Sequence, residues 1–269
     1  MKTNTVIIGA GIIGMAIARE IAMKGHEVIV LERHPRAGEE TSSRNSGVIH
    51  SGIYYPTGSK KALLCVEGNR LLYEYANRRK VPHKNTGKLV VATTPEEKDK
   101  LESLYHRGSD NNVKGLKLLS KKEVMNKQKE IKAEEALYCP SSGIIDAAAL
   151  IQSLDAELQE LGVIVSFNSE VTDIQVIGSN EFRLKVTSSE DFTIDCENLI
   201  NSAGLSAVFL ANKIKNIPSE IIPNAYFAKG HYFQLSGSHP FQDYLIYPLN
   251  LSLIHISEPT RRYAISYAV

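Results

Sequence analysis

A glycine-rich turn near the beginning of the sequence constrains its fold more than any other feature. Residues 9–14 read Gly-Ala-Gly-Ile-Ile-Gly and directly follow Val6–Ile8, a β-branched, fully apolar run typical of a strand buried on both faces. Apolar residues at helical spacing follow from Met15 to Lys24, and a second apolar run covers Val28–Leu31. This order of strand, glycine turn, helix and strand predicts a βαβ unit that binds a dinucleotide.

The three glycines have distinct steric roles in such a turn. Gly9 permits the tight turn, Gly11 lets the backbone approach the pyrophosphate, and Gly14 lets the helix pack closely on the strand. The phosphates would lie against unpaired N–H groups at the helix N-terminus, where the helix dipole favours negative charge. Glu32 ends the second strand 18 residues after Gly14, near the spacing of ~20 typical of the acid that binds ribose hydroxyls. Its charge would repel the 2′-phosphate of NADP, so FAD and NAD remain.

The loop that follows the second strand favours FAD over NAD. Residues 41–46, Thr-Ser-Ser-Arg-Asn-Ser, combine small hydroxyl groups with an arginine and an asparagine. These groups could bind a second phosphate and then the flavin ring, which a nicotinamide enzyme would not need here. A merely flexible polar loop would not explain the apolar and aromatic run that continues to Tyr55. We therefore predict FAD as the cofactor.

The rest of the pattern indicates an α/β fold. We expect helices over residues 59–79, 95–107, 120–128 and 146–162, and strands over 88–94, 163–167, 171–177, 182–187, 192–195 and 199–200. The helix that follows Asp146 should pack through Leu150, Leu154, Leu158 and Leu161, which share one face.

Composition excludes several classes of partner. The 31 basic and 30 acidic residues give a net charge of +1, which provides no field to attract nucleic acid or an anionic membrane. The three cysteines are far apart in the sequence and fit neither a disulfide framework nor a zinc site, which indicates a reducing compartment. No apolar run approaches the ~18 residues of a membrane span, and no leader precedes the first strand. We expect a cytoplasmic protein with no membrane span, no metal and no nucleic-acid partner.

Residues 44–55, Arg-Asn-Ser-Gly-Val-Ile-His-Ser-Gly-Ile-Tyr-Tyr, resemble the L-2-hydroxyglutarate dehydrogenase/oxidase family of the D-amino-acid-oxidase (glycine-oxidase-like) superfamily. Shorter matches follow at residues 61–62, 64–68, 71–75, 87–92, 139–140 and 143–146, so the resemblance covers roughly residues 3–248. It implies a Rossmann-like FAD-binding domain of the glutathione-reductase/D-amino-acid-oxidase type, interleaved with an α+β substrate domain and incomplete at the C-terminus. We place the FAD-binding domain at residues 1–85 and 144–212, and the substrate domain at 86–143 and 213–250.

The resemblance also implies a reaction and a set of cofactor residues. The reaction is oxidation of an L-2-hydroxy acid, with L-2-hydroxyglutarate expected, to the 2-oxo acid by non-covalently bound FAD, with a quinone or oxygen as electron acceptor. The implied cofactor residues are Gly9, Gly11 and Gly14 at the pyrophosphate, Glu32 at the ribose with Arg33 beside it, Ser42, Ser43, Arg44, Asn45 and Ser46 along the pyrophosphate and flavin, the backbone of Val171 at the adenine, and Ala203 and Gly204 close to the cofactor.

Oxidation of a 2-hydroxy acid needs a base for the hydroxyl proton, a role that suits an imidazole. His50 is the first candidate and His231 the second; a structural, hydrogen-bonded histidine is the alternative for His50. The substrate carboxylates need cations or hydroxyl donors. The candidates are Tyr54, Tyr55, Lys229, Tyr232 and Tyr247, although tyrosines are also common packing residues. Residues 229–232, Lys-Gly-His-Tyr, replace the usual Arg-Gly-acidic-Tyr of the family, which would alter the preferred acid if they line the pocket.

Two other functions stay open on the sequence alone. One is an amine or amino-acid oxidase, or a glycerol-3-phosphate dehydrogenase, of the same superfamily, although the motif from His50 to Tyr55 argues against both. The other is a truncated nucleotide-binding fragment without activity. Residues 251–269 resemble a translated sequencing adapter, so we expect an artefactual end and a true sequence that continues beyond Pro248.

Overall fold

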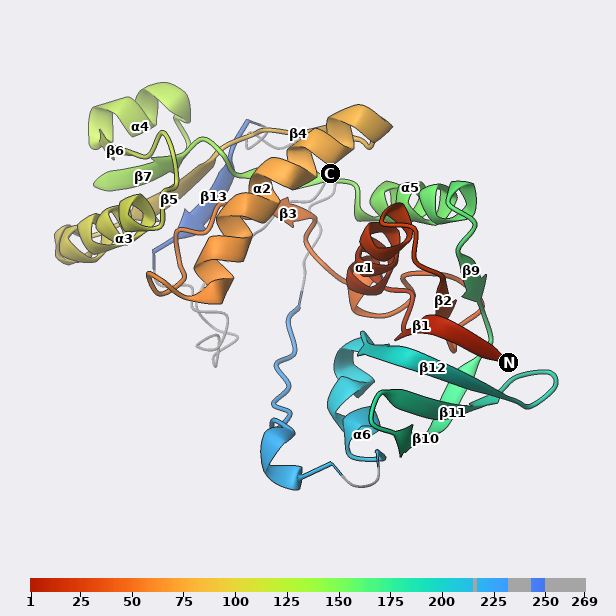
Figure 1. The fold of residues 1–269 in the computed structure, drawn as a ribbon. Helices are drawn as coiled ribbons and strands as arrows, with labels where there is room; N and C mark the ends of the chain where they lie inside the picture. The colour runs from red at the N-terminus through yellow and green to blue at the C-terminus, as the bar shows by residue number, and fades with distance from the viewer. Residues whose placement is uncertain (215–216, 232–242, 250–269) are drawn as a thin grey trace. The chain divides into compact units, whose positions relative to one another are not determined.

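The computed structural model describes residues 1–214, 217–231 and 243–249 (Figure 1). Contacts divide the chain into two units, Met1–Asn45 with Ala147–Phe227, and Ser46–Asp146 with Ala228–Val269. The chain therefore first passes from one unit to the other after Asn45. From the sequence we placed this boundary at residue 85. Tyr232 and the tail 251–269 lie outside the described residues.

The first unit is built on a six-stranded sheet in the order β10-β11-β12-β1-β2-β9. Its strands are β1 (Lys2–Ile8), β2 (Val28–Leu31), β9 (Ile164–Ser166), β10 (Glu170–Gly178), β11 (Glu181–Thr187) and β12 (Phe192–Asn201). β1 lies between β12 and β2 and runs parallel to both, while β10, β11 and β12 are antiparallel. The predicted βαβ unit is present, and β2 has the predicted bounds.

β12 corrects one prediction, because the two strands expected at residues 192–195 and 199–200 are one continuous strand. Its first half pairs antiparallel with β11 and its second half pairs parallel with β1. The two pairings overlap at Asp195 and Cys196, and the next two residues, Glu197 and Asn198, are both exposed. Two successive exposed polar residues break the alternation that identifies a strand, although Asn198 still pairs with Thr5. The sequence therefore suggested a gap that the main chain does not have.

Two helices of this unit, α1 (Ile12–Met23) and α5 (Ala147–Glu160), pack side by side (Figure 1). An ion pair joins them, with 2.9 Å between Arg19 Nε and Glu157 Oε2. α5 buries Leu150, Leu154 and Leu158 as expected, together with Ile151. Leu161 does not join them, because it lies past the end of the helix and is exposed. Shorter helical segments are η1 (Thr41–Ser43), η3 (Gly204–Ser206), α6 (Ala207–Ala211) and η4 (Ser219–Ile221).

The second unit contains a four-stranded sheet in the order β13-β5-β7-β6 and a small sheet in the order β3-β8-β4. The strands are β3 (Val48–Ile49), β4 (His83–Lys84), β5 (Lys88–Ala92), β6 (Lys117–Ser120), β7 (Glu135–Cys139), β8 (Gly143–Ile145) and β13 (Leu245–Pro248). The helices are α2 (Lys60–Arg79), η2 (Pro95–Glu97), α3 (Lys98–Asp110) and α4 (Lys121–Lys127). Only β5 was predicted among these strands.

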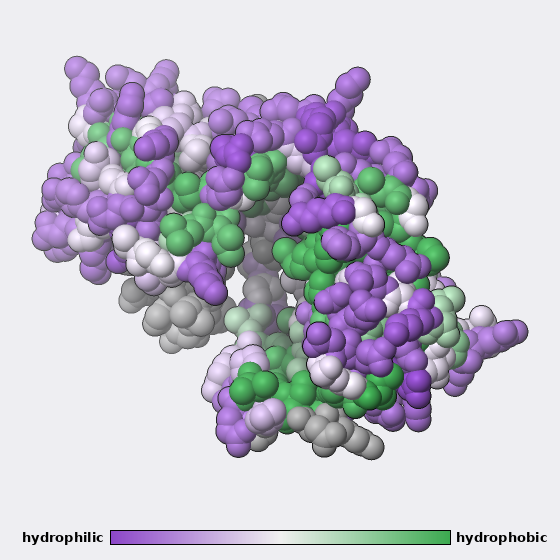
Figure 2. Space-filling model, in the orientation of Figure 1, coloured by the Kyte–Doolittle hydropathy of each residue, from purple (hydrophilic) through white to green (hydrophobic). Residues whose placement is uncertain are grey.

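Both faces of β5 are buried, because a helix packs on each side of the four-stranded sheet. Val90 and Ala92 pack with residues of α3, whereas Leu89 and Val91 pack with Val124 of α4. Because side chains alternate along a strand, Lys88 belongs to the α3 face with Val90. The outer surfaces over α3 and α4 are largely hydrophilic (Figure 2), as expected of helices with one apolar face.

Candidate functional site

The turn between β1 and α1 leaves no room for side chains at two of its glycines. Gly9 has a φ of +103°, and a Cβ there would lie 2.6 Å from the carbonyl oxygen of Ser202. A Cβ on Gly14 would lie 2.1 Å from the carbonyl oxygen of Gly9. At Gly11 the nearest atom would be the Ser42 hydroxyl oxygen, at 3.1 Å. The turn therefore has the close backbone packing that a pyrophosphate-binding turn requires.

The N-terminus of α1 offers main-chain donors rather than a side-chain cap. Gly11 occupies the N-cap position without a capping side chain, and the first turn contains no acidic residue. The Ile12 amide donates to Ser42 Oγ at 3.1 Å, which brings Ser42 to this helix end. A helix end of this kind carries partial positive charge and binds anions such as phosphate.

The Glu32 carboxylate is held at the end of β2. The residue is 8% exposed, and its two carboxylate oxygens accept hydrogen bonds from the Ala10 amide at 2.8 Å and the His34 amide at 2.9 Å. A carboxylate offers about four acceptor positions. Two positions therefore remain for hydroxyl donors such as those of a ribose.

The predicted loop residues are not all directed to one point. Ser43 Oγ and Arg44 Nη1 donate to the carbonyl oxygen of Glu39 at 2.8 and 2.6 Å, and Asn45 Nδ2 donates to that of Ser42 at 2.7 Å. Of the predicted loop residues, the structure thus brings Ser42 to the glycine turn. Ser46 groups with the second unit.

Arg33 is engaged by the same loop. Its guanidinium forms an ion pair with Glu40, and this hydrogen bond raises the Arg33 pKa. Hydrogen bonds from His34 and from Arg33 lower the pKa of Glu40. The expected cofactor role of Arg33 stays a prediction.

Residues 202 and 203 lie against the glycine turn. The Ser202 amide donates to the Ile8 carbonyl at 2.9 Å, and the Ala203 Cα would lie 3.3 Å from a Cβ on Gly9. Gly204 has a φ of +53°. Val171 is farther along the sheet, buried among core side chains and paired with Val186. The structure therefore places Ser202 and Ala203 at the turn, and leaves the cofactor contact of Gly204 and the adenine contact of Val171 as predictions.

The second unit contains a buried cation that the sequence reasoning missed. Lys88, the first residue of β5, is 0% exposed, and its Nζ has no hydrogen-bond partner among the described residues. The Nζ lies 4.2 Å from the ring centroid of Tyr247 and 5.4 Å from that of Tyr54. Burial lowers the pKa of Lys88 to about 8. A charged residue that opens an otherwise apolar strand, residues 88–92, was the available signal.

The charge of this cation acts on His50. Its residue retains solvent access, but the imidazole is largely surrounded by protein. This burial, with the positive charges of Lys88 and then Lys61, lowers the pKa of His50 to about 4. Asn69 of α2 fixes the backbone, donating to the carbonyl oxygen of His50 at 2.9 Å. The imidazole is therefore neutral near pH 7 and able to accept a proton.

Two predicted residues contact Lys88, because the rings of Tyr54 and Tyr247 lie close to its Nζ, and the charge of Lys88 acts on a third, His50. Burial also raises the pKa of Tyr54, which stays a neutral hydroxyl. Tyr55 instead contacts Lys61, whose Nζ lies 4.7 Å from its ring centroid. The other candidates are not brought into this group, because Lys229 and His231 are exposed in coil and Tyr232 is outside the described residues.

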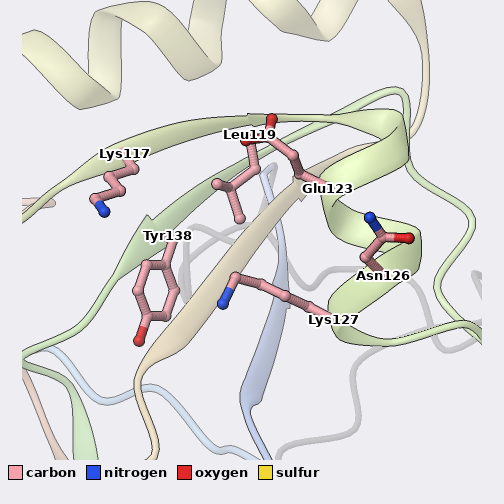
Figure 3. Close-up of a pocket in the computed structure, with 6 residues that line it drawn as sticks. All are labelled: Lys117, Leu119, Glu123, Asn126, Lys127 and Tyr138. Atoms are coloured by element: carbon pink, nitrogen blue, oxygen red, sulfur yellow. The ribbon is translucent and has the colours of Figure 1, made fainter.

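A shallow pocket lies on the α4 side of the same sheet (Figure 3). It is lined by Lys117, Leu119, Glu123, Asn126, Lys127 and Tyr138. None of the predicted site residues lines it. Glu123 is engaged in the capping box of α4 with Ser120, so the pocket offers mainly exposed lysines and an aromatic ring.

Within the described ranges, no three or more His, Cys, Asp or Glu side chains gather where a metal ion could bind. In the same ranges, no helix combines the length and the apolar character needed to cross a membrane.

Known proteins resemble the chain over most of its length. Residues 4–268 match the family model described as FAD dependent oxidoreductase (DAO). Arabidopsis thaliana "L-2-hydroxyglutarate dehydrogenase, mitochondrial" is 37% identical over 92% of this chain and 57% of that protein. The Homo sapiens protein of the same name is 35% identical over 75% of this chain and 46% of that protein. The chain thus spans about half the length of the curated relatives it matches.

Solved structures share the fold. L-alpha-glycerophosphate oxidase from Mycoplasma pneumoniae, solved with FAD bound, has a TM-score of 0.78 at 24% identity, covering 93% of this chain and 65% of that chain. Glycine oxidase from Geobacillus kaustophilus has a TM-score of 0.71 at 24% identity, covering 79% and 58%. At these identities the likeness establishes the fold and does not decide between substrates.

Proposed function

The chain belongs to the DAO family of FAD-dependent oxidoreductases, and on that premise we propose that it oxidises an L-2-hydroxy acid, expected to be L-2-hydroxyglutarate, to the 2-oxo acid. The observation that carries the proposal is the activity named for the curated relatives that match most of the chain. The amino-acid and glycerol-3-phosphate alternatives have only fold-level likeness in support.

FAD would be held in the first unit by its adenosine diphosphate half. The glycine cradle at Gly9 and Gly14, which a Cβ would fill, suits the pyrophosphate. The remaining acceptor positions of Glu32 suit ribose hydroxyls. We assign the neighbouring predicted residues to the same cofactor, namely Gly11, Arg33, Ser42, Ser43, Arg44, Asn45, Ser46, Val171, Ala203 and Gly204. When bound, FAD supplies the acceptor for the hydride that leaves the substrate carbon.

His50 would take the hydroxyl proton of the substrate. A base must be unprotonated to do so, and desolvation with the charges of Lys88 and Lys61 keeps this imidazole neutral. The hydroxyl of Tyr54, kept protonated by burial, would be available as a hydrogen-bond donor. Tyr55 and Tyr247 remain substrate candidates. His231, Lys229 and Tyr232 are retained as candidates on the resemblance alone.

The acceptor that reoxidises the flavin would be a quinone or oxygen. The cytoplasmic location expected from the sequence stays a prediction, and the relatives named above are mitochondrial.

The test is reduction of bound flavin. The purified full chain is loaded with FAD, made anaerobic and mixed with L-2-hydroxyglutarate, and the visible flavin absorbance is followed. We expect bleaching by this acid and not by its D-enantiomer, glycine or glycerol 3-phosphate. Bleaching by an amino acid or by glycerol 3-phosphate instead would reject the substrate, and a colourless chain that does not take up FAD would reject the cofactor assignment.

A further inference from the structure

We propose that Lys88 binds a carboxylate group of the substrate, as a buried ammonium group that has no counter-ion within the described part of the chain. This assignment rests on the proposed oxidation of a 2-hydroxy acid and deepens it, because it names the residue that recognises the acid. Lys88 was not among the residues expected from the sequence.

The first support is burial without a compensating charge. Lys88 is 0% exposed, and among the described residues the groups that act on its pKa besides burial are the thiols of Cys139 and Cys65. No carboxylate is among them. A buried cation that lacks an anionic partner is strongly destabilising, and lysines are almost never fully buried unless they are paired.

The second support is the way the ammonium group is held. The rings of Tyr247 and Tyr54 contact it, and the Nζ makes no hydrogen bond to the described residues. Cation–π contacts recover only part of the lost hydration and leave the three N–H donors unused. An incoming anion would supply both the missing charge and the missing acceptors.

The third support is the set of residues that neighbour Lys88. Its side chain belongs to the face of β5 that packs with Ile53, Tyr54 and Tyr247, and its charge acts on His50. A carboxylate on Lys88 would therefore bring an anionic substrate to the neutral imidazole. A single ammonium group is a point charge that suits one carboxylate, whereas a phosphate group usually receives several donors.

The test uses glutarate, a dicarboxylate without the reacting hydroxyl group, so that binding is measured apart from oxidation. Calorimetric titration of the full chain should show binding to wild type that weakens about 30-fold or more in Lys88→Met. Lys88→Arg, which keeps the charge, should bind more tightly than Lys88→Met. Lys100→Met is the matched control: it removes an exposed lysine of α3 and should leave the affinity unchanged.

A stability measurement separates this role from a structural one. Methionine has a similar volume and no charge to bury, so Lys88→Met should melt at a temperature equal to or above that of wild type. A clear fall in melting temperature, with unchanged glutarate affinity, would show that Lys88 is structural.

The wild-type chain provides a second arm in case Lys88→Met does not fold. Lys88 has a pKa of about 8, so raising the pH from 7 to 9 should weaken glutarate binding about tenfold as the ammonium group loses its proton. His50, with a pKa of about 4, does not titrate in this range. The other titratable groups facing this site are those of Tyr54, Tyr247, Cys65, Cys139 and Lys61. Affinity that is constant between pH 7 and 9 would overturn the assignment.

The outcomes distinguish this assignment from the proposed function. Lys88-dependent glutarate binding without flavin bleaching by L-2-hydroxyglutarate would keep the assignment and reject the substrate. Bleaching with the same concentration dependence in wild type and Lys88→Met would keep the function and reject the assignment. Wild type that does not bind glutarate would reject it as well.

Discussion

The carboxylate of Glu32 accepts a hydrogen bond from the main-chain amide of Ala10, with 2.8 Å between the two atoms. The residue expected to bind the ribose therefore also holds the glycine turn expected to bind the pyrophosphate. Loss of the carboxylate should weaken the cofactor site in two ways at once, through the missing ribose contact and through a less ordered turn.

Glu32→Gln tests this coupling. An amide side chain has one acceptor oxygen, so either the Ala10 or the His34 amide would face an NH₂ group and lose its partner. We expect a loss of about 1–3 kcal/mol in the free energy of unfolding without FAD, together with weaker FAD binding. Chemical denaturation and fluorescence titration with FAD measure the two effects. Weaker FAD binding at unchanged stability would show that Glu32 contacts only the ribose.

Gly14→Ala should disrupt the turn sterically. The new methyl group would lie 2.1 Å from the carbonyl oxygen of Gly9, an atom of the main chain that cannot rotate away. We expect a loss of about 2 kcal/mol or more in stability and loss of FAD binding. Gly68→Ala is the matched control, since a Cβ there meets nothing within 4 Å and the site is in helix α2. This control should be neutral or stabilising, by up to about 1 kcal/mol.

Replacement of His50 separates chemistry from cofactor binding. His50→Gln removes the base, and we expect the anaerobic rate of flavin reduction to fall by about 10²–10⁴. FAD affinity should stay the same, because the residues assigned to the pyrophosphate and ribose are unchanged. Stopped-flow absorbance and FAD titration measure the two quantities. A reduction rate within about threefold of wild type would assign His50 a structural role.

The pH dependence of the reaction should report the same residue. Because the neutral imidazole accepts the proton, the second-order rate constant for flavin reduction should be flat between about pH 5 and 7, below the pKa of Lys88, and fall as the pH drops through about 4. A decline centred near the ordinary histidine value of 6.5 would contradict the lowered pKa of His50.

The free energy of unfolding should also decrease at low pH. The pKa of His50 is lower in the folded chain than in the unfolded chain, so the unfolded state binds more protons between pH 6.5 and about 4. Folding stability should therefore fall as the pH is lowered through that range. The variant His50→Gln should show a shallower fall in denaturation midpoints measured across the same range.

Local patterns were sufficient for the cofactor turn. Val6–Ile8, the three glycines and Val28–Leu31 lie within the first 31 residues, and β1 pairs with β2 inside this stretch. The two-residue strands β3 and β4 and the three-residue strand β8 are different, because each is defined by a distant partner, as in the pairing of Val48 with Ile144. Such short segments carry no periodicity of their own.

The substrate-binding residues also depend on distant partners that local sequence patterns do not reveal. His50 and the tyrosines stood out by residue type and by a family motif. Lys88 did not, because its significance is its burial, and that depends on Tyr247 reaching it from a strand more than a hundred residues later. From the sequence we placed the first domain boundary at residue 85, whereas the contacts group Ser46 and α2 with the second unit.

The double pairing of β1 has a consequence for biosynthesis. This strand finds β2 within the first few dozen residues, but its other neighbour, β12, is about 193 positions later, as the contact between Asn4 and Glu197 shows. At a translation rate of about 5–20 residues per second, one edge of β1 stays open for roughly 10–40 s while the ribosome makes the rest. An open parallel edge of apolar residues attracts other chains. During that interval the nascent chain should depend on chaperones, and expression at lower temperature should improve the soluble yield.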